Sequence, residues 1–260
     1  MKNIRVLAVG DIVGRAGRHI YLDKIMGMKD RLRIDIIIVN GENAAGGYSL
    51  TQEIAHDIFK SGASVITSGN HIWDNRDIAS VLDREQALIR PANYPPGSPG
   101  NGYHTFMYKG TTITVMNLLG RALMEAVDCP FRAFDEIYEK IKDESDIIIL
   151  DFHAESTSEK RAMGWYVDGK ISAIFGTHTH VQTADEEILP QGTGYITDAG
   201  MTGSFDSVIG MRKEESLERF LTQRRVRFEP AKKDPRINGI LFDINDEGKT
   251  VNVERIIERA

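Results

Sequence analysis

The chain has 260 residues, of which 41% are hydrophobic and 27% are charged, and its formal net charge is −6. This balance predicts a folded protein with a sizeable core, and it excludes disorder and a surface that attracts nucleic acid over its whole area. Cys129 is the only cysteine, which excludes an intrachain disulfide and a multi-cysteine metal site. Because no linker interrupts the pattern, we expect a single domain over residues 1–260.

The N-terminal apolar run, Ile4–Val9, has the length of a buried strand and is too short for the apolar part of a signal peptide. No stretch of the sequence approaches the roughly 18–20 apolar residues that a membrane span requires. We therefore expect a cytoplasmic protein with no membrane partner.

Short, continuous runs rich in Ile and Val recur along the chain, and such runs are typical of strands buried on both faces. They are Ile4–Val9, Asp35–Val39, Ala63–Thr67, Thr112–Asn117, Asp146–Leu150, Ile171–Phe175 and Gly194–Thr197. Helical spacing of apolar residues appears in Leu50–Ser61 and Arg132–Lys142. The alternation of strands and helices in the first eighty residues predicts βαβ units and a parallel sheet covered by helices.

The middle of the chain has a different pattern. Arg90–Gly102 is rich in proline and glycine and predicts a turn-rich loop. Residues 102–120 then predict a hairpin that turns at Lys109-Gly110, and Ile237–Ile257 predicts another that turns at residues 245–248. We therefore expect a second half that is more antiparallel than the first. The expected fold is an α/β sandwich, in which two mixed sheets pack between outer helices.

Polar side chains follow five of the predicted strands, at the point where each strand ends. The segments are Gly10-Asp11, Asn40-Gly41-Glu42-Asn43, Ser68-Gly69-Asn70-His71, Asp151-Phe152-His153-Ala154-Glu155 and Gly176-Thr177-His178-Thr179-His180. Four of the seven histidines of the chain lie in these segments. Because ligands of open α/β sheets bind beyond the carboxyl ends of the strands, we expect one site at this edge.

The chemistry of these side chains indicates a metal site. Two divalent metals about 3.5–4 Å apart need a bridging carboxylate, with imidazole and carbonyl ligands around it. A donor set of nitrogen and oxygen without thiolate favours Mn, Fe or Zn in a reactive site over a structural zinc. Such a metal pair lowers the pKa of water toward ~7 and stabilises an in-line phosphoryl transition state.

Several motifs in this order resemble the YmdB-like branch of the calcineurin-like metallophosphoesterases. The matching segments are residues 10–15, 40–47, 67–74, 90–95, 151–155, 176–185 and 197–203. The sequence departs from the broad superfamily in two places, which are both typical of this branch. Asp11-Ile12-Val13 lacks the usual histidine, and Glu42 stands where the superfamily has a bridging aspartate. The resemblance implies a metallophosphoesterase-type αββα sandwich.

The resemblance also implies roles for individual residues. One metal is expected on Asp11, Asn43 and His180, the other on Asn70, His153 and His178, with Glu42 bridging the two. His71 is expected to act without metal, as a general acid or as an imidazolium that binds the phosphate. The resemblance implies two metal ions per chain, with Fe or Mn first and Zn or Mg as alternatives. The implied reaction is hydrolysis of 2′,3′-cyclic nucleotides by a hydroxide that bridges the metals.

Two other functions stay open at this point. The same metal centre serves a phosphomonoesterase or a protein phosphatase. Alternatively, the site is regulatory, and the protein binds RNA or RNA-decay partners in a metal-dependent way. The basic run Arg224–Arg227, with Lys232, Lys233 and Arg236, is either a solvated face or a flap that faces RNA or a partner. A homo-oligomer is also left open.

Overall fold

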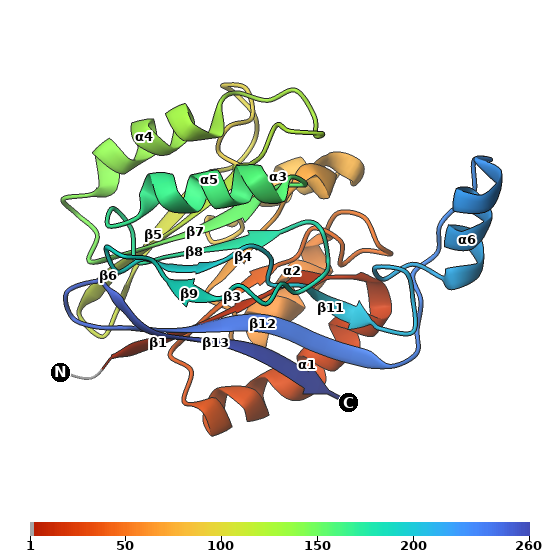
Figure 1. Ribbon diagram of the computed structural model, residues 1–260, viewed down its shortest axis with the longest axis horizontal. Coiled ribbons are helices and arrows are strands. Elements are labelled where there is room, and N and C mark those ends of the chain that lie inside the picture. The colour runs from red at the N-terminus through yellow and green to blue at the C-terminus, as the bar shows by residue number, and fades with distance from the viewer. Residues whose placement is uncertain (1–2) are drawn as a thin grey trace.

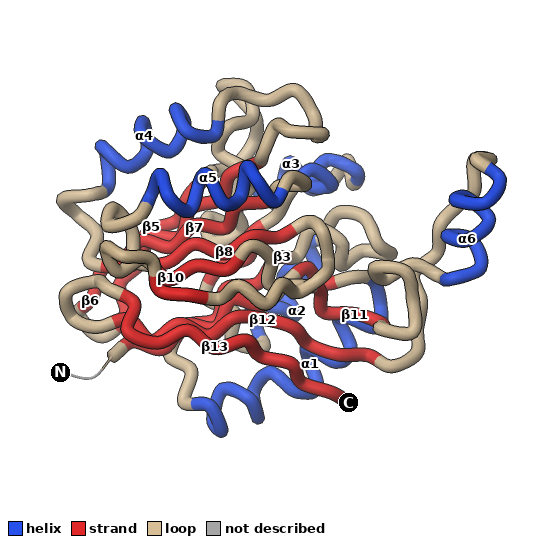
Figure 2. Tube along the Cα trace, in the orientation of Figure 1, coloured by secondary structure: helices blue, strands red, loops and turns tan. Residues whose placement is uncertain are grey.

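Two β-sheets pack face to face, and helices cover the outer face of each (Figure 1). The structure is a computed structural model that describes residues 3–260. Figure 2 shows the strands gathered in the interior, with the helices outside them. Both sheets contain parallel and antiparallel pairs. The αββα sandwich of two mixed sheets that we expected is therefore confirmed.

The first sheet has seven strands in the order β2-β11-β12-β1-β3-β4, with β13 beside β12. Its strands are β1 (Ile4–Val9), β2 (Asp11–Ile12), β3 (Ile36–Asn40), β4 (Val65–Thr67), β11 (Met201–Ser204), β12 (Pro235–Ile244) and β13 (Thr250–Arg259). The strands β1, β3 and β4 are parallel, as the predicted βαβ units require. The predicted C-terminal hairpin is also confirmed, and it joins this sheet by pairing β12 with β1.

The second sheet has six strands in the order β5-β6-β7-β8-β10-β9. Its strands are β5 (Tyr103–Tyr108), β6 (Thr111–Leu119), β7 (Ile147–His153), β8 (Ala173–Thr177), β9 (Glu187–Ile188) and β10 (Gly194–Ile196). The predicted hairpin is confirmed as β5 and β6. The expectation of a more antiparallel second half is wrong at the centre of this sheet, because β6, β7, β8 and β10 are parallel. Helices between β6, β7 and β8 provide the crossovers that parallel pairing needs.

The helices form the two outer layers and one projecting segment. They are α1 (Gly14–Leu32), α2 (Gln52–Lys60), α3 (Ile78–Leu82), α4 (Pro130–Ile141), α5 (Thr157–Val167) and α6 (Lys213–Thr222), with the 3₁₀ turn η1 (Asn70–Asp74). The first three pack on the first sheet, and α4 and α5 pack on the second. Figure 1 shows α6 standing apart from both sheets. None of the helices within residues 3–260 is long and apolar enough to cross a membrane.

Alternate residues of each central strand face different layers of the sandwich. In β3, Ile36 and Ile38 lie between the two sheets, whereas Ile37 and Val39 face the helices of the first sheet. Both sets are fully or almost fully buried. Each such side chain contributes about 1.5–3 kcal/mol of hydrophobic stabilisation. Burial on both faces explains why the strands appear as continuous apolar runs.

Candidate metal centre

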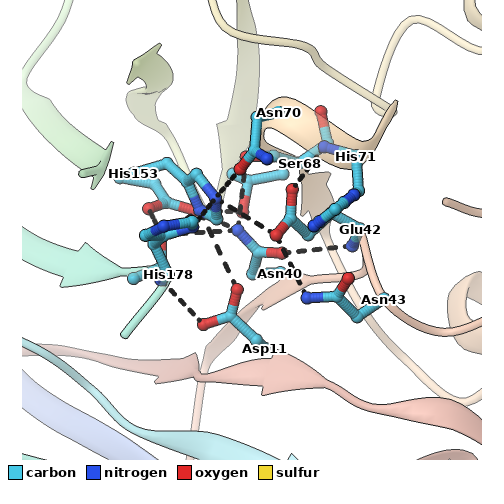
Figure 3. Close-up of polar contacts among 12 residues, drawn as sticks. Asp11, Asn40, Glu42, Asn43, Ser68, Asn70, His71, His153 and His178 are labelled. Atoms are coloured by element: carbon cyan, nitrogen blue, oxygen red, sulfur yellow. Dashed lines mark hydrogen bonds and ion pairs between the residues drawn. The ribbon is translucent and has the colours of Figure 1, made fainter. Parts of the chain in front are cut away.

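The side chains expected to bind metal gather at one edge of the sandwich. They follow the carboxyl ends of β1, β3 and β4 in one sheet and of β7 and β8 in the other. Figure 3 shows the labelled carboxylates, amides and imidazoles of this group pointing toward one another. His180 joins them through a contact with Asn43. The structure thus brings together Asp11, Glu42, Asn43, Asn70, His71, His153, His178 and His180.

Three side chains converge on one nitrogen of His153. Its Nε2 lies 3.0 Å from Asn70 Oδ1, 3.1 Å from His178 Nδ1 and 3.1 Å from Glu42 Oε1. A single ring nitrogen carries one proton or one lone pair, so it cannot satisfy all three neighbours. A cation among these atoms would satisfy them together. Glu42, His153 and His178 place their ligand atoms within 4.8 Å of one another, in the range that a metal ion can span.

The other nitrogen of His153 is held by a buried network. The hydroxyl of Thr177 donates to Asp151 Oδ1 at 2.6 Å, so its oxygen accepts from His153 Nδ1 at 2.9 Å. Thr67 donates to the other oxygen of Asp151 at 2.5 Å. This chain of bonds places the proton of the neutral ring on Nδ1 and leaves the lone pair of Nε2 directed at the site.

His178 is oriented in a similar way from the opposite side. Its Nε2 lies 3.2 Å from Glu155 Oε2, and its backbone N–H donates to Asp11 Oδ2 at 3.2 Å. This contact with the Glu155 carboxylate favours the tautomer of His178 that carries its proton on Nε2, and Nδ1 is the nitrogen that faces His153. The backbone of His178 lies in the left-handed region, with φ of 96°. Asp11 therefore helps to hold a backbone conformation that a non-glycine residue rarely adopts.

A second group of donors lies beside the first. Asn43 Nδ2 is 3.1 Å from both Glu42 Oε1 and His180 Nε2, while Asp11 Oδ1 is 4.0 Å from His180 Nε2. His180 Nδ1 donates to the carbonyl oxygen of Ile209 at 2.9 Å, which leaves the lone pair on Nε2. Glu42 Oε1 touches both groups, so its position suits a bridging ligand.

Two oxygens of this second group have no hydrogen-bond partner among the described residues. Asp11 Oδ1 and Asn43 Oδ1 are both buried and unpaired. Leaving a buried acceptor unpaired costs about 1–3 kcal/mol, so such atoms point to a cation that completes their environment. Gly69 supports the same interpretation, because a Cβ at this position would overlap Glu42 Oε2 and His153 Nε2. The donor set and its close packing therefore fit metal ions.

The charges of the site are strongly coupled. Burial alone would raise the pKa of Glu42, but attraction to His153 outweighs it and lowers the pKa to about 2. Burial lowers the pKa of His153, yet Glu42 and Asp11 reverse this effect and raise the pKa to about 9. Burial and the neighbouring His153 lower the pKa of His178 to about 3. Burial raises the pKa of Asp11, because its carboxylate is fully enclosed. The site is therefore rich in carboxylates that positive charge stabilises.

His71 lies at the border of the group, where it lines a cleft. Its Nδ1 is 2.8 Å from Asp74 Oδ2, and its ring packs edge-to-face against Tyr48 at 5.2 Å between ring centroids. The backbone N–H of His71 donates to Glu42 Oε2 at 3.1 Å. The side chain is therefore fixed in orientation without joining the metal-binding group.

The cleft above the site has a volume of about 450 Å³. Its floor includes Glu42, Asn43, His71, His178 and His180, and much of the rest of its lining is apolar. The basic side chains of residues 224–236 do not line it. Arg236 is paired with Asp234 at 2.5 Å, and Arg224 lies 4.0 Å from Glu218. A partner-binding role of this basic run stays a prediction.

Four residues that support the ligands had no role predicted from the sequence. Asp151 and Thr177 connect to His153, and Lys160 and Asp198 form a buried pair beneath the loop that carries His178. A signal for Asp151 was present, because residues 151 and 153 of one strand point to the same face. The sequence contains no comparable signal for Lys160, because this residue lies in α5, a helix that was not predicted.

Comparisons with known proteins identify the family of the chain. The YmdB-like protein family matches residues 7–256. A Bacillus subtilis protein named 2′,3′-cyclic-nucleotide 2′-phosphodiesterase is 45% identical over 255 residues, which cover 98% of this chain and 97% of that protein. A crystal structure of a phosphatase from Mycoplasma pneumoniae has a TM-score of 0.94 and 36% identity, over 100% of this chain and 95% of the other. A Thermus thermophilus structure has a TM-score of 0.93 and 37% identity, over 98% and 99% of the two chains.

The fold and these relatives place the chain among phosphoesterases of the metallophosphoesterase type. The chain belongs to the YmdB-like family, as the sequence motifs indicated.

Proposed function

We propose that the protein is a two-metal phosphodiesterase that hydrolyses 2′,3′-cyclic nucleotides. The observation that carries the proposal is the convergence of Asn70, His178 and Glu42 on one nitrogen of His153, beside the unpaired oxygens of Asp11 and Asn43. The substrate class is supported by the name of the Bacillus subtilis relative. The single core between the sheets also supports our proposal that residues 1–260 act as one domain.

The residues divide into two sets of ligands around a shared carboxylate. In the proposal, Asp11, Asn43 and His180 hold one ion; Asn70, His153 and His178 hold the other; and Glu42 contacts both. Nitrogen and oxygen donors of this kind suit Fe or Mn. Bound metals would lower the pKa of water toward ~7 and offset the charge of the phosphate.

Side chains of the protein supply the proton for the leaving group and keep the metal ligands in the required tautomer. Asp74 accepts from His71 Nδ1, so Nε2 is the ring nitrogen that remains for a ligand in the cleft that His71 lines. In the proposal, the imidazolium form of His71 keeps its Nδ1 proton in the hydrogen bond to Asp74 and donates its Nε2 proton to the ribose oxygen as the bond between that oxygen and phosphorus breaks. The Thr177–Asp151 network keeps His153 in the tautomer that binds metal.

A phosphomonoesterase is the second candidate, since the Mycoplasma pneumoniae structure is described as a phosphatase. The ratio of kcat/KM for 2′,3′-cyclic AMP and for adenosine 3′-monophosphate, measured with Mn²⁺, separates the two. We expect the diester to be the better substrate. Faster turnover of the monoester would reject the phosphodiesterase in favour of the phosphatase.

A regulatory protein that binds RNA or RNA-decay partners is the third candidate. It predicts that a Glu42→Gln variant, folded but without metal, still corrects the defect of cells that lack the protein. The phosphodiesterase predicts that this variant fails to do so.

A further inference from the structure

The cleft over the metal centre has one wall that the proposed chemistry does not use. This wall consists of Val208, Ile209, Met211, Phe220 and Phe228, and we call it the 208–228 wall. These residues share the cleft with Glu42, His71 and His178. An apolar surface therefore faces the same space as the charged floor.

Parts of the 208–228 wall are unusually exposed for such large apolar residues. Phe220 is 71% exposed and Ile209 is 50% exposed. Phe220 belongs to α6, which stands apart from both sheets in Figure 1, so this ring is not part of the core. An exposed aromatic ring beside a polar site is typical of a surface that a ligand covers.

Ile209 connects the 208–228 wall to the metal centre. Its carbonyl oxygen accepts the hydrogen bond from His180 Nδ1, and its φ is 46°. The left-handed region is strongly unfavourable for a β-branched residue, so the surrounding structure must hold it there. The backbone bonds between Val208 and Met211 provide this support. The hydrogen bond therefore fixes the position of Ile209 relative to His180.

Tyr48 lines the cleft as well, from the loop after β3. Its ring is 38% exposed and packs edge-to-face on His71. The cleft therefore offers aromatic and aliphatic surfaces beside a floor suited to phosphate. Its volume of about 450 Å³ lies within the range of about 300–1,000 Å³ that small-molecule pockets have.

We propose that the 208–228 wall and Tyr48 bind the base of a nucleotide whose phosphate lies on the floor of the cleft. This inference rests on the proposed function and names the part of the substrate that this surface recognises. Stacking accepts any base, because every base has a π-face. The enzyme is therefore expected to discriminate only weakly between bases.

The test compares two cyclic diesters with the full-length, Mn²⁺-loaded protein. One is 2′,3′-cyclic AMP, and the other is glycerol 1,2-cyclic phosphate, which has the same five-membered ring and no base. Phe220→Ala should raise KM for the nucleotide about tenfold, because stacking on one aromatic ring has an effect of this order. It should leave kcat, and both constants for the base-free diester, unchanged.

Leu221→Ala is the matched control. Leu221 lies next to Phe220 on α6, is 81% exposed and does not line the cleft. We expect this variant to match the wild type with both substrates. Unchanged KM in Phe220→Ala, or an equal change for both diesters, would overturn the assignment. An equal change accompanied by loss of an oligomer in sedimentation would instead mean that a second copy of the chain covers the wall.

A wrong proposal for the function and a wrong proposal for the base site give different results in this test. A folded, Mn²⁺-loaded wild type that hydrolyses neither diester would reject the phosphodiesterase. Binding of adenosine 3′-monophosphate and of glycerol phosphate to the same variants would then decide the role of the wall. Weaker binding of the nucleotide alone in Phe220→Ala supports the base site, and equal binding by all proteins overturns it.

Discussion

A buried ion pair supports the loop that carries two of the proposed ligands. Lys160 and Asp198 are almost completely buried, and Lys160 Nζ lies 2.6 Å from Asp198 Oδ2. The same oxygen accepts from the backbone N–H of Thr179 at 3.2 Å and from its hydroxyl at 2.6 Å. Thr179 stands between His178 and His180, both of which have positive φ. We infer that this pair holds the two imidazoles in a conformation they would otherwise leave.

Lys160→Met removes the ammonium group and keeps most of the apolar stem. Removing one partner of a buried pair costs about 3–5 kcal/mol, because the other charge is left uncompensated. Asp198 keeps its bonds to Thr179 and to the N–H of Gly200, so we expect a loss near the lower end, about 3 kcal/mol. The variant should also bind Mn²⁺ more weakly, because the loop is less firmly held.

The assay is urea unfolding in EDTA. It compares the wild type with the single variants Lys160→Met and Asp198→Asn and with the double variant that carries both changes. If the two groups interact, the double variant loses less stability than the sum of the single losses, by about 0.5–3 kcal/mol. Single effects that add to within about 0.5 kcal/mol would refute the inference that the pair acts as a unit.

Three further predictions concern the residues in and around the metal centre. Thr177→Val removes the hydroxyl that accepts from His153 Nδ1 and should weaken Mn²⁺ binding about 10–100-fold in calorimetry. Thr177→Ser keeps the hydroxyl and should keep the affinity. Equal Mn²⁺ affinity in the two variants would contradict the role of this hydrogen bond. Gly69→Ala should also reduce Mn²⁺ binding, because the added Cβ would overlap Glu42 and His153. Gly27→Ala in α1 is the control. Its Cβ meets no atom within 4 Å, so this change should raise the free energy of unfolding by roughly 0.5–1 kcal/mol. In metal-free protein, the raised pKa of His153 and the lowered pKa of Glu42 make their attraction fully stabilising between pH 4.5 and 6.5. This stabilisation is lost as the pH rises through about 9 and as it falls through about 2. The stability difference between wild type and Glu42→Gln should follow that profile in urea unfolding, and a difference that does not vary with pH would show that the attraction is unimportant.

Much of the fold could be predicted because its central strands are buried on both faces. This burial produces continuous β-branched runs, such as the one in β3, that stand out in the sequence. Helices α2 and α4 have clear apolar stripes and were predicted within two residues of their bounds. Helix α1 was not, because its inner face includes Gly14 and Gly17, which carry no apolar side chain. Gly17 is required there, since a Cβ would overlap the carbonyl oxygen of Thr202.

The candidate ligands could be found because they lie within a few residues of the strand ends. The supporting residues could not, because Lys160 and Asp198 are 38 residues apart and meet only in the folded chain. The same holds for the 208–228 wall. The exposure of Phe220 and the contact of the Ile209 carbonyl with His180 depend on how the segment after β11 folds over the site.

The most direct test of the two-metal phosphodiesterase is one titration of metal-free protein with Mn²⁺, in which bound metal and turnover of 2′,3′-cyclic AMP are measured together. We predict that activity rises with bound metal and saturates at two ions per chain. Glu42→Gln, while still folded, should bind less metal and show no turnover. Full activity with one ion, or activity in the presence of EDTA, would contradict a two-metal mechanism.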